Sequence, residues 1–457
     1  MGKRLIFVLV VALALSFSVA AYAETQNLKV SGDLLMRAVD RSAFTLNKGG
    51  KYEVSGLITD ARVRIDADLT DNVAITVRLL NERAWGSSWA SDTIYGVTLG
   101  TSEVSDDINI DLAYVTLKEF LYSPLTMVVG RQDLRYGNGL IIGNPGTDEW
   151  EVPADLSIKR SFDTIKAILN YDPLVVDVFF AKVNENDLWY AVTVLPEDND
   201  VNLYGVNAKY DMSGLGITGT TDLYYFSRIN RSTSYTATIE DEDTVHTMGF
   251  LVSGQIRENL TGSIEYARQF GNVAADVIAA NAGVNLDRSA WALQVAANLA
   301  LSKRWSPNLG LMFTILSGDR RDNGKYTFWN PMFEDQVPNA IVNAILPFTN
   351  CVAINAKASI QPAEDVTITG IYGYYQLAKE MSRNNGIPSI YGAGGFYTTS
   401  DEKDLGHALD LIGTYDYTED VQLGLAFGYF DPGDAFNKGD GYKQSATQLI
   451  GSMKVTF

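Results

Sequence analysis

The chain has 457 residues, and its 55 acidic residues outnumber its 36 basic residues, which gives a formal net charge of −19. This charge argues against a nucleic-acid-binding protein, because binding to phosphates requires a basic surface. The single cysteine, Cys351, excludes an internal disulfide bond and any Cys-x-x-Cys metal or haem site.

The N-terminal residues have the pattern of a secretory signal peptide. Lys3 and Arg4 form a basic region, residues 5–15 an apolar region, and residues 21–23 an A-x-A cleavage site. We therefore expect residues 1–23 to be a signal peptide that is removed from the mature chain. After the leader, no run of about 18 apolar residues offers a transmembrane helix.

Segments of about ten residues with alternating polarity recur along the chain, which is typical of membrane-barrel strands. The predicted strands are residues 27–40, 57–69, 73–82, 108–119, 125–133, 160–171, 174–182, 201–211, 217–228, 245–257, 260–270, 288–302, 306–316, 351–360, 366–377, 405–417, 421–430 and 446–457. The pattern predicts an all-β, transmembrane, antiparallel up-and-down β-barrel of 18 strands, with 16 as the alternative. The last strand is expected to pair with the first and close the sheet, because lipid cannot satisfy a free edge.

The connections between these segments alternate between short and long. Short ones, such as residues 70–72 and 172–173, are followed by long ones, such as residues 83–107, 134–159 and 317–350. Short periplasmic turns and long external loops produce this rhythm when both termini are periplasmic. We therefore expect residues 24–457 to form a single outer-membrane β-barrel with long extracellular loops.

Each predicted strand has an apolar and a polar face. In the second strand, Val63 and Ile65 alternate with Arg62, Arg64 and Asp66. In a membrane barrel the apolar face would meet lipid, and the polar face would line a wet lumen.

Seven short motifs follow one another from residue 130 to the C-terminal region. They are GRQDLRYG at 130–137, RSFD at 160–163, EYARQFG at 265–271, SGD at 317–319, FWNPMF at 328–333, LGHALDL at 405–411 and FDPGDAF at 430–436. In this order the chain resembles the alginate-export family of bacterial outer-membrane barrels. The resemblance implies an 18-stranded barrel that conducts a polysaccharide outward, with an arginine-rich lumen for a polyanion such as alginate.

The residues predicted to face the lumen carry both signs of charge. The basic ones are Arg62, Arg64, Arg78, Lys166, Lys209, Arg257, Lys357 and Lys454, and the acidic ones are Asp60, Asp66, Asp68, Asp111, Asp177, Asp222, Glu265 and Asp410. Such a mixture would not produce a strong positive field for a polyanion.

The densest basic cluster is Arg131, Arg135 and Arg160, beside a glycine-rich loop. These arginines could form a ladder that binds a passing solute, or pair with Asp133 and Asp163 to hold the loop inside the barrel. The glycines allow an inward constriction and equally a flexible external turn. The predicted substrate-path residues are Arg131, Arg135, Arg160, Asp163, Lys166, Arg62, Arg64, Arg78, Glu265, Gln269 and Asp319.

Acidic groups in the long loops have two interpretations. Residues 197–200, residues 240–243, and Asp319 with Asp322 could bind Ca²⁺ or Mg²⁺ through oxygen ligands, or form a solvated outer surface. Their spacing matches no specific metal-binding motif, and we expect no metal site.

An enzymatic function has little support in the sequence. Only His246 and His407 could serve as imidazole bases, and neither a G-x-S-x-G nor an H-E-x-x-H motif is present. No glycine-rich phosphate loop suggests ATP-driven transport. We expect no catalytic residues and no cofactor.

The sequence thus predicts a passive outer-membrane channel of a Gram-negative bacterium, most simply an exporter of a polysaccharide. The alternatives are a substrate-selective porin that imports small solutes and a barrel that sheathes a partner protein. The expected partners are outer-membrane lipid and lipopolysaccharide, the hydrophilic solute, and periplasmic secretion proteins, with no nucleic acid.

Overall fold

The computed structural model describes residues 27–44, 46, 53–85, 108–143, 161–184, 200–231, 242–273, 286–319, 325–336, 339–346, 348–380, 402–436 and 443–457. The predicted signal peptide lies outside these residues. Within them, no helix is long and apolar enough to cross a membrane.

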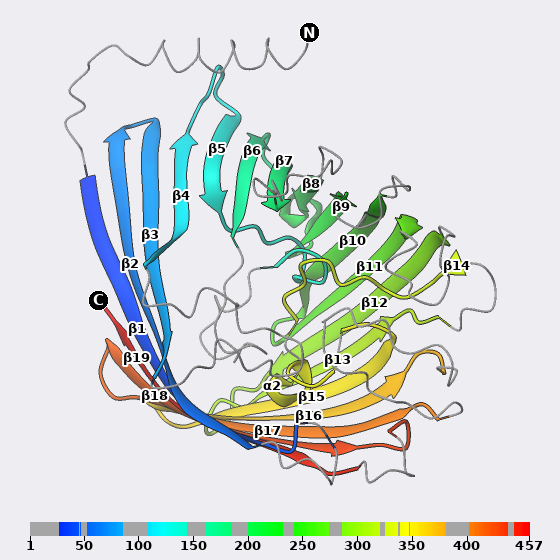
Figure 1. The fold of residues 1–457 in the computed structure, drawn as a ribbon. Coiled ribbons are helices and arrows are strands. Elements are labelled where there is room, and N and C mark those ends of the chain that lie inside the picture. The colour runs from blue at the N-terminus through cyan, green and yellow to red at the C-terminus, as the bar shows by residue number, and fades with distance from the viewer. Residues whose placement is uncertain are drawn as a thin grey trace, which may run out of the picture.

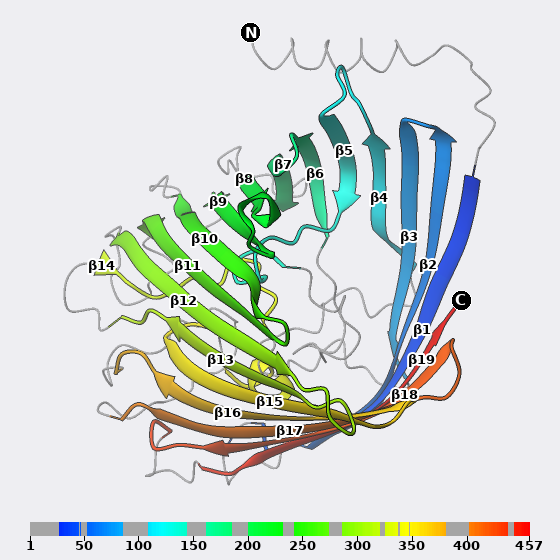
Figure 2. The same ribbon diagram turned by 180° about the vertical axis from the view of Figure 1, so that it is seen from behind.

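Eighteen strands form the wall of a closed antiparallel barrel, and a short additional strand, β14 (Lys325–Tyr326), pairs in parallel with β12 (Figures 1 and 2). The wall consists of β1 (Asn27–Ser42), β2 (Glu53–Thr70), β3 (Val73–Ala84), β4 (Asn109–Leu117), β5 (Leu125–Gln132), β6 (Phe162–Asn170), β7 (Leu174–Asn184), β8 (Val201–Asp211), β9 (Gly219–Asn230), β10 (Asp243–Arg257), β11 (Leu260–Val273), β12 (Leu286–Ala300), β13 (Asn308–Leu316), β15 (Cys351–Ala363), β16 (Val366–Leu377), β17 (Asp404–Asp416), β18 (Val421–Pro432) and β19 (Ala446–Thr456). Each wall strand pairs with its neighbours in chain order, and β13 pairs directly with β15.

The seam of the barrel joins the last strand to the first. β19 pairs with β1 from Asp33 opposite Thr456 to Ser42 opposite Thr447. At the end of the seam, Gly32 and Phe457 exchange two backbone hydrogen bonds, with N···O distances of 2.9 and 3.0 Å. The predicted closure and the predicted count of 18 strands are therefore confirmed.

Each predicted strand corresponds to a wall strand, and the differences lie at the strand ends. β2 begins four positions before the predicted start at residue 57, because its ladder with β1 continues to the pair of Ser42 and Glu53. The described residues also contain α2 (Ala340–Asn343) and a 3₁₀ turn, η2 (Ser213–Leu215). These turns are too short to produce a detectable helical periodicity.

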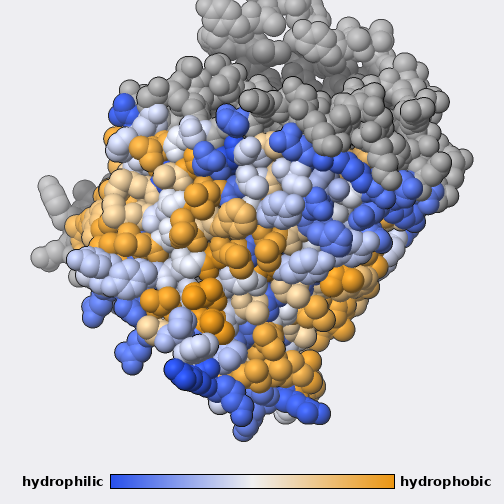
Figure 3. Space-filling view, turned by 90° about the horizontal axis from the view of Figure 1, so that it is seen from below, coloured by the Kyte–Doolittle hydropathy of each residue, from blue (hydrophilic) through white to orange (hydrophobic). Residues whose placement is uncertain are grey.

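The outer face of the wall is apolar. On β18, the alternation predicted from the sequence leaves Leu423, Leu425 and Phe427 exposed. Figure 3 shows apolar residues across much of one outer side, with hydrophilic residues more frequent toward its margins. This face is the surface that meets lipid in a membrane barrel.

The interior differs from the uniformly wet lumen that we expected. Near the strand ends that join the long loops, inward residues such as Phe162 and Phe179 belong to one large buried apolar cluster. The cluster also contains Leu140, Ile141 and Ile142, which follow β5. This part of the lumen is apolar because chain segments fold into the barrel and cover these wall residues.

Candidate functional site

Four arginines of the first three strands form a row of ion pairs on the inner face of the barrel. They share a strand face with Asp60 and Asp66 and lie opposite to the outward residues Val63 and Ile65. The pairs are Arg37 with Asp60, Arg62 with Asp33 (2.5 Å), Arg64 with Asp66 (2.8 Å) and Arg78 with Asp111 (2.5 Å). We call these eight residues the paired-charge wall. Since each guanidinium has a carboxylate partner, the wall has polar groups but only a weak net field.

A first inward loop, residues 133–143, enters the barrel after β5 (Figure 1). Its Tyr136 stacks on Phe179 of β7, with ring centroids 5.4 Å apart and an interplanar angle of 4°. The Tyr136 hydroxyl donates a hydrogen bond to Asp177 at 3.2 Å. Burial raises the pKa of this hydroxyl above its ordinary value, so Tyr136 remains a hydrogen-bond donor.

Glu265 of β11 anchors the same loop. Its carboxylate accepts hydrogen bonds from the backbone N–H of Asn138 at 3.1 Å and from the Tyr224 hydroxyl at 2.9 Å. The glutamate is fully buried. Gly137 makes this approach possible: its φ is +59°, and a Cβ there would lie 2.5 Å from a carboxylate oxygen.

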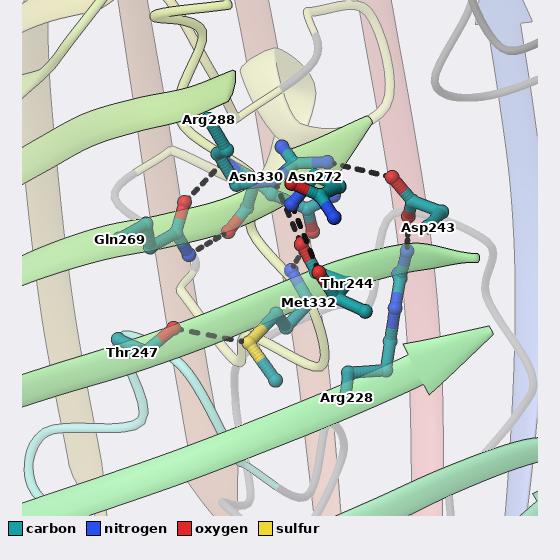
Figure 4. Close-up of polar contacts among 9 residues, drawn as sticks. All are labelled: Arg228, Asp243, Thr244, Thr247, Gln269, Asn272, Arg288, Asn330 and Met332. Atoms are coloured by element: carbon teal, nitrogen blue, oxygen red, sulfur yellow. Dashed lines mark hydrogen bonds and ion pairs between the residues drawn. The ribbon is translucent and has the colours of Figure 1, made fainter. Parts of the chain in front are cut away.

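A second inward loop comprises residues 325–336 and 339–346 and lies between β13 and β15 in the sequence. Gln269 of β11 forms two hydrogen bonds with the backbone of Asn330, with N···O distances of 2.7 and 2.9 Å (Figure 4). The Asn330 side chain accepts from the Met332 backbone N–H at 2.8 Å, and Thr247 contacts the Met332 sulfur at 3.3 Å. These contacts attach the FWNPMF motif to the inner wall.

Beside this attachment, Asp243 lies between two arginines (Figure 4). One carboxylate oxygen is 2.6 Å from Arg228 and the other is 2.8 Å from Arg288. The guanidinium of Arg288 also lies over the ring of Tyr326, 5.2 Å from its centroid. The cluster therefore fixes the start of the second loop at the ends of β9, β10 and β12.

The other end of the second loop is attached through α2. Asp410 of β17 accepts hydrogen bonds from the Ala340 backbone N–H at 2.8 Å and from the Asn339 amide at 2.9 Å. The side-chain oxygen of Asn339 in turn accepts hydrogen bonds from the Asn355 amide at 2.9 Å and from the Tyr375 hydroxyl at 2.8 Å. Asp410 on β17 is thus the counterpart of Glu265 on β11: each buried carboxylate holds the backbone of an inward loop.

The two inward loops also bind each other, and together we call them the inner plug. The backbone N–H of Gly143 donates to Phe333 at 2.8 Å, and that of Asp335 donates to Gly139 at 2.8 Å. Arg135 and Asp335 form an ion pair of 2.5 Å. Both loops come from long connections between strands and pack inside the wall, so they narrow the passage.

Most of the predicted substrate-path residues lie on the inner face. Arg62, Arg64 and Arg78 belong to the paired-charge wall, while Arg135, Glu265 and Gln269 hold the inner plug. Lys166 lies opposite the inward Phe179 in the register of β6 and β7. Asp319 accepts from the Thr327 backbone N–H at 3.0 Å, which stabilises the approach to the second loop.

Three predicted residues require separate treatment. Arg131 and Asp163 pair with each other at 3.5 Å, but they share the outward face with Val129 and Ile165. The expectation that both line the lumen is therefore corrected: strict alternation along β5 and β6 turns them outward. Arg160 lies outside the described residues.

Sequence reasoning missed the polar residues of the inner plug, notably Asn138, Asp335, Gln336 and Asn339. The Gln336 side chain donates to the Asn138 backbone carbonyl at 2.7 Å and accepts from the Gln294 amide of β12 at 2.7 Å. The one feature of the sequence that could have indicated these residues is the high density of small polar residues, glycine and proline around the GRQDLRYG and FWNPMF motifs.

Both histidines lie on the outer face and have tyrosine partners. His246 Nδ1 is 3.0 Å from the Tyr225 hydroxyl and 2.9 Å from the Ser227 hydroxyl, and His407 Nδ1 is 2.7 Å from the Tyr372 hydroxyl. In the described part of the chain, neither imidazole forms an ion pair with a carboxylate. No arrangement of a catalytic base with an orienting acid is seen there.

The acidic loop groups are only partly described, since residues 197–199, residues 240–241 and Asp322 fall outside the described ranges. Asp200 pairs with Lys182, and Glu242 pairs with Arg231 at 2.6 Å. Among the described residues, no group of three potential ligands could hold a metal ion.

Comparison with known proteins connects this architecture to a family. The family model for alginate export matches residues 26–448. No curated protein matches the chain.

Three solved structures from Pseudomonas aeruginosa have a similar fold. OccK8 (OprE) has a TM-score of 0.57 at 12% identity, covering 95% of this chain and 99% of that one. OccD3 (OpdP) has a TM-score of 0.55 at 11% identity, covering 95% and 93%. OpdK with vanillate has a TM-score of 0.53 at 11% identity, covering 94% and 99%. At these identities the likeness concerns the fold alone.

Proposed function

Because this chain belongs to the alginate-export family, we propose that it exports a polysaccharide, alginate or a related exopolysaccharide, by passive passage across the outer membrane. The family and the barrel fold make it a channel of the Gram-negative outer membrane. The solute and the direction of transport are the proposal. We also propose that residues 1–23 are the signal peptide that directs the chain there.

The observation that carries the proposal is the asymmetry of the lumen. The inner plug is attached to β11 through Glu265 and Gln269, and to β17 through Asp410. On the first strands, Arg64 and Asp66 remain accessible, with 38% and 33% of their side chains exposed. The proposed path runs between the plug and the paired-charge wall.

The chemistry of this wall suits a hydroxyl-rich chain. Guanidinium and carboxylate groups can exchange hydrogen bonds with sugar hydroxyls and so replace the hydration of a moving polymer. Because the charges are paired, the wall would act through hydrogen bonds more than through a positive field. Among the exopolysaccharides proposed above, this favours one with a lower charge density than alginate.

Planar-bilayer conductance and a deletion strain test the proposal together. Export predicts that the deletion strain loses exopolysaccharide from its surface and that the purified polymer blocks the conductance of the wild-type channel. Replacing Arg62 and Arg64 by alanine should weaken this block. Unchanged exopolysaccharide in the deletion strain, together with no block, would contradict export.

A substrate-selective porin that imports small solutes is the second candidate. The inner plug favours it, because two packed loops leave less room for a polymer, and the similar OpdK structure contains vanillate. Loss of growth on one small solute in the deletion strain, with normal exopolysaccharide, would support import.

The third candidate, a barrel that sheathes a partner protein, has less support because the chain's own loops occupy the interior. The proposed passive channel needs no cofactor and no catalytic residue. Periplasmic secretion proteins are the partners that export would require, since the polymer has to reach the channel.

A further inference from the structure

Four neighbouring strands bring a polar cluster together on the outer face. The strand registers place Tyr225, Met248, Arg268 and Trp291 side by side in one row across β9, β10, β11 and β12. The next row toward the external loops contains Ser227, His246, Phe270 and Ser289. We call these eight residues the outer cluster.

The rows on the periplasmic side of the outer cluster are apolar. The adjoining row contains Leu223, Phe250, Tyr266 and Leu293, and the row after it contains Val252, Ile264 and Val295 with Thr221 of β9 at its end. Several of these side chains are exposed, as lipid-facing residues are. The outer cluster therefore lies at the external border of the apolar belt, where tyrosine and tryptophan commonly meet lipid headgroups.

Arg268 differs from three other cations near these strand ends, Arg131, Lys182 and Arg231. Its guanidinium donates a hydrogen bond to the Ser289 hydroxyl at 2.7 Å, and within the described residues it forms no ion pair. Arg131, Lys182 and Arg231, in contrast, each pair with a carboxylate. An exposed cation at the edge of a membrane is stabilised by an anionic group, and the described residues supply none to Arg268.

His246 adds a second donor to the same surface. Its Nδ1 is contacted by the hydroxyls of Tyr225 and Ser227. When Nδ1 accepts from these hydroxyls, the ring proton is on Nε2, which then becomes a donor. The ring also packs against Phe270, with centroids 5.3 Å apart, so its orientation is held by three neighbours.

We propose that the outer cluster is a lipopolysaccharide-binding site, in which Arg268 binds a phosphate group of lipid A in the external leaflet and His246 is a second donor to the same headgroup. The charge and the position of these residues support the assignment. A lone guanidinium and an imidazole donor lie directly above an apolar surface of four strands, which matches a phosphate attached to acyl chains. A soluble anion has no acyl chains that could contact the apolar rows.

The test measures binding of purified lipid A to the detergent-purified full chain by native mass spectrometry. Lipid A with both phosphates should bind the wild-type barrel about tenfold more tightly than it binds Arg268→Gln, a difference of about 1.4 kcal/mol. Arg268→Lys should retain most of the affinity, because it keeps the charge. Arg131→Gln serves as the matched control, since this outward arginine already has a carboxylate partner.

Equal binding to the wild type and Arg268→Gln would overturn the proposal. So would wild-type affinity for dephosphorylated lipid A, or complete displacement of lipid A by inorganic phosphate, which would indicate a site for a soluble anion. If Arg268→Gln fails to fold, the comparison of phosphorylated with dephosphorylated lipid A on the wild type still decides the question.

Discussion

Arg135 and Asp335 lie 200 positions apart in the sequence and form an ion pair of 2.5 Å inside the barrel. The pair joins the first inward loop to the second. Since Glu265 holds the first loop and Asp410 holds the second, the ion pair connects two anchors on different parts of the wall. The inner plug is therefore expected to behave as one mechanical unit.

Replacing Arg135 by alanine should loosen this unit. The side chain of Asp335 is almost fully buried, with 4% exposed, so the substitution leaves its carboxylate without this partner at a cost of about 1–3 kcal/mol. Hydrogen exchange should become faster in residues 133–143, and single-channel recordings should show larger fluctuations. Arg131→Ala, on the outward face, is the control; identical exchange in the two variants would contradict the role of the ion pair.

Removing the first anchor should have a larger local effect. Glu265→Ala deprives the Asn138 N–H and the Tyr224 hydroxyl of their acceptor, which should destabilise the attachment of the first loop by about 1–3 kcal/mol. Mean conductance should rise as the loop leaves the wall. Glu258→Ala, in an exposed turn, should leave conductance unchanged.

The two anchors should be energetically coupled. Asp410→Ala frees the backbone N–H of Ala340 and the Asn339 amide, which releases α2. If the plug is one unit, the double variant with Glu265→Ala should deviate from additivity by more than about 0.5 kcal/mol in the free energy of plug opening. The opening free energy follows from the fraction of time in open and closed conductance levels; strict additivity would show that the loops move independently.

Gly137→Ala tests the close approach of the first loop to Glu265. The residue has φ +59°, and an added Cβ would lie 2.5 Å from the carboxylate, so strain and steric conflict together should cost about 1–3 kcal/mol. Gly216→Ala provides a matched control, because Gly216 has φ +75° with nothing within 4 Å of the added Cβ. Thermal unfolding in detergent should show a larger loss for Gly137→Ala; equal losses would mean that backbone strain alone is responsible.

Ion selectivity should respond to the paired-charge wall. Arg64→Ala leaves Asp66 without its partner on a half-exposed surface, so the lumen becomes more negative and the channel more cation-selective. Because such a pair is worth about 0.5 kcal/mol, the permeability ratio should change roughly twofold. The reversal potential in a salt gradient measures this change. Arg131→Ala should leave it unaltered, because that side chain points outward.

The wall of the barrel could be predicted from local patterns. Alternation of Val63 and Ile65 with Arg62 and Arg64 identifies a strand and both of its faces, because side chains of a strand point alternately to the two sides. Short turns such as residues 70–72 then force neighbouring strands into antiparallel pairs. The same alternation assigns Arg131 to the face of Val129; the expected lumen position rested instead on its closeness in sequence to Arg135.

The inner plug could not be predicted in this way. Any long loop of a barrel can extend outward or fold inward, and the choice depends on contacts between residues that are distant in sequence. Asn138 meets Glu265 across 127 positions, and Asn339 meets Asp410 across 71 positions. Periodicity along the chain determined which residues face inward. Only the closed barrel decided which of those residues bind a loop, because a carboxylate becomes buried beside a backbone N–H only after distant strands have come together.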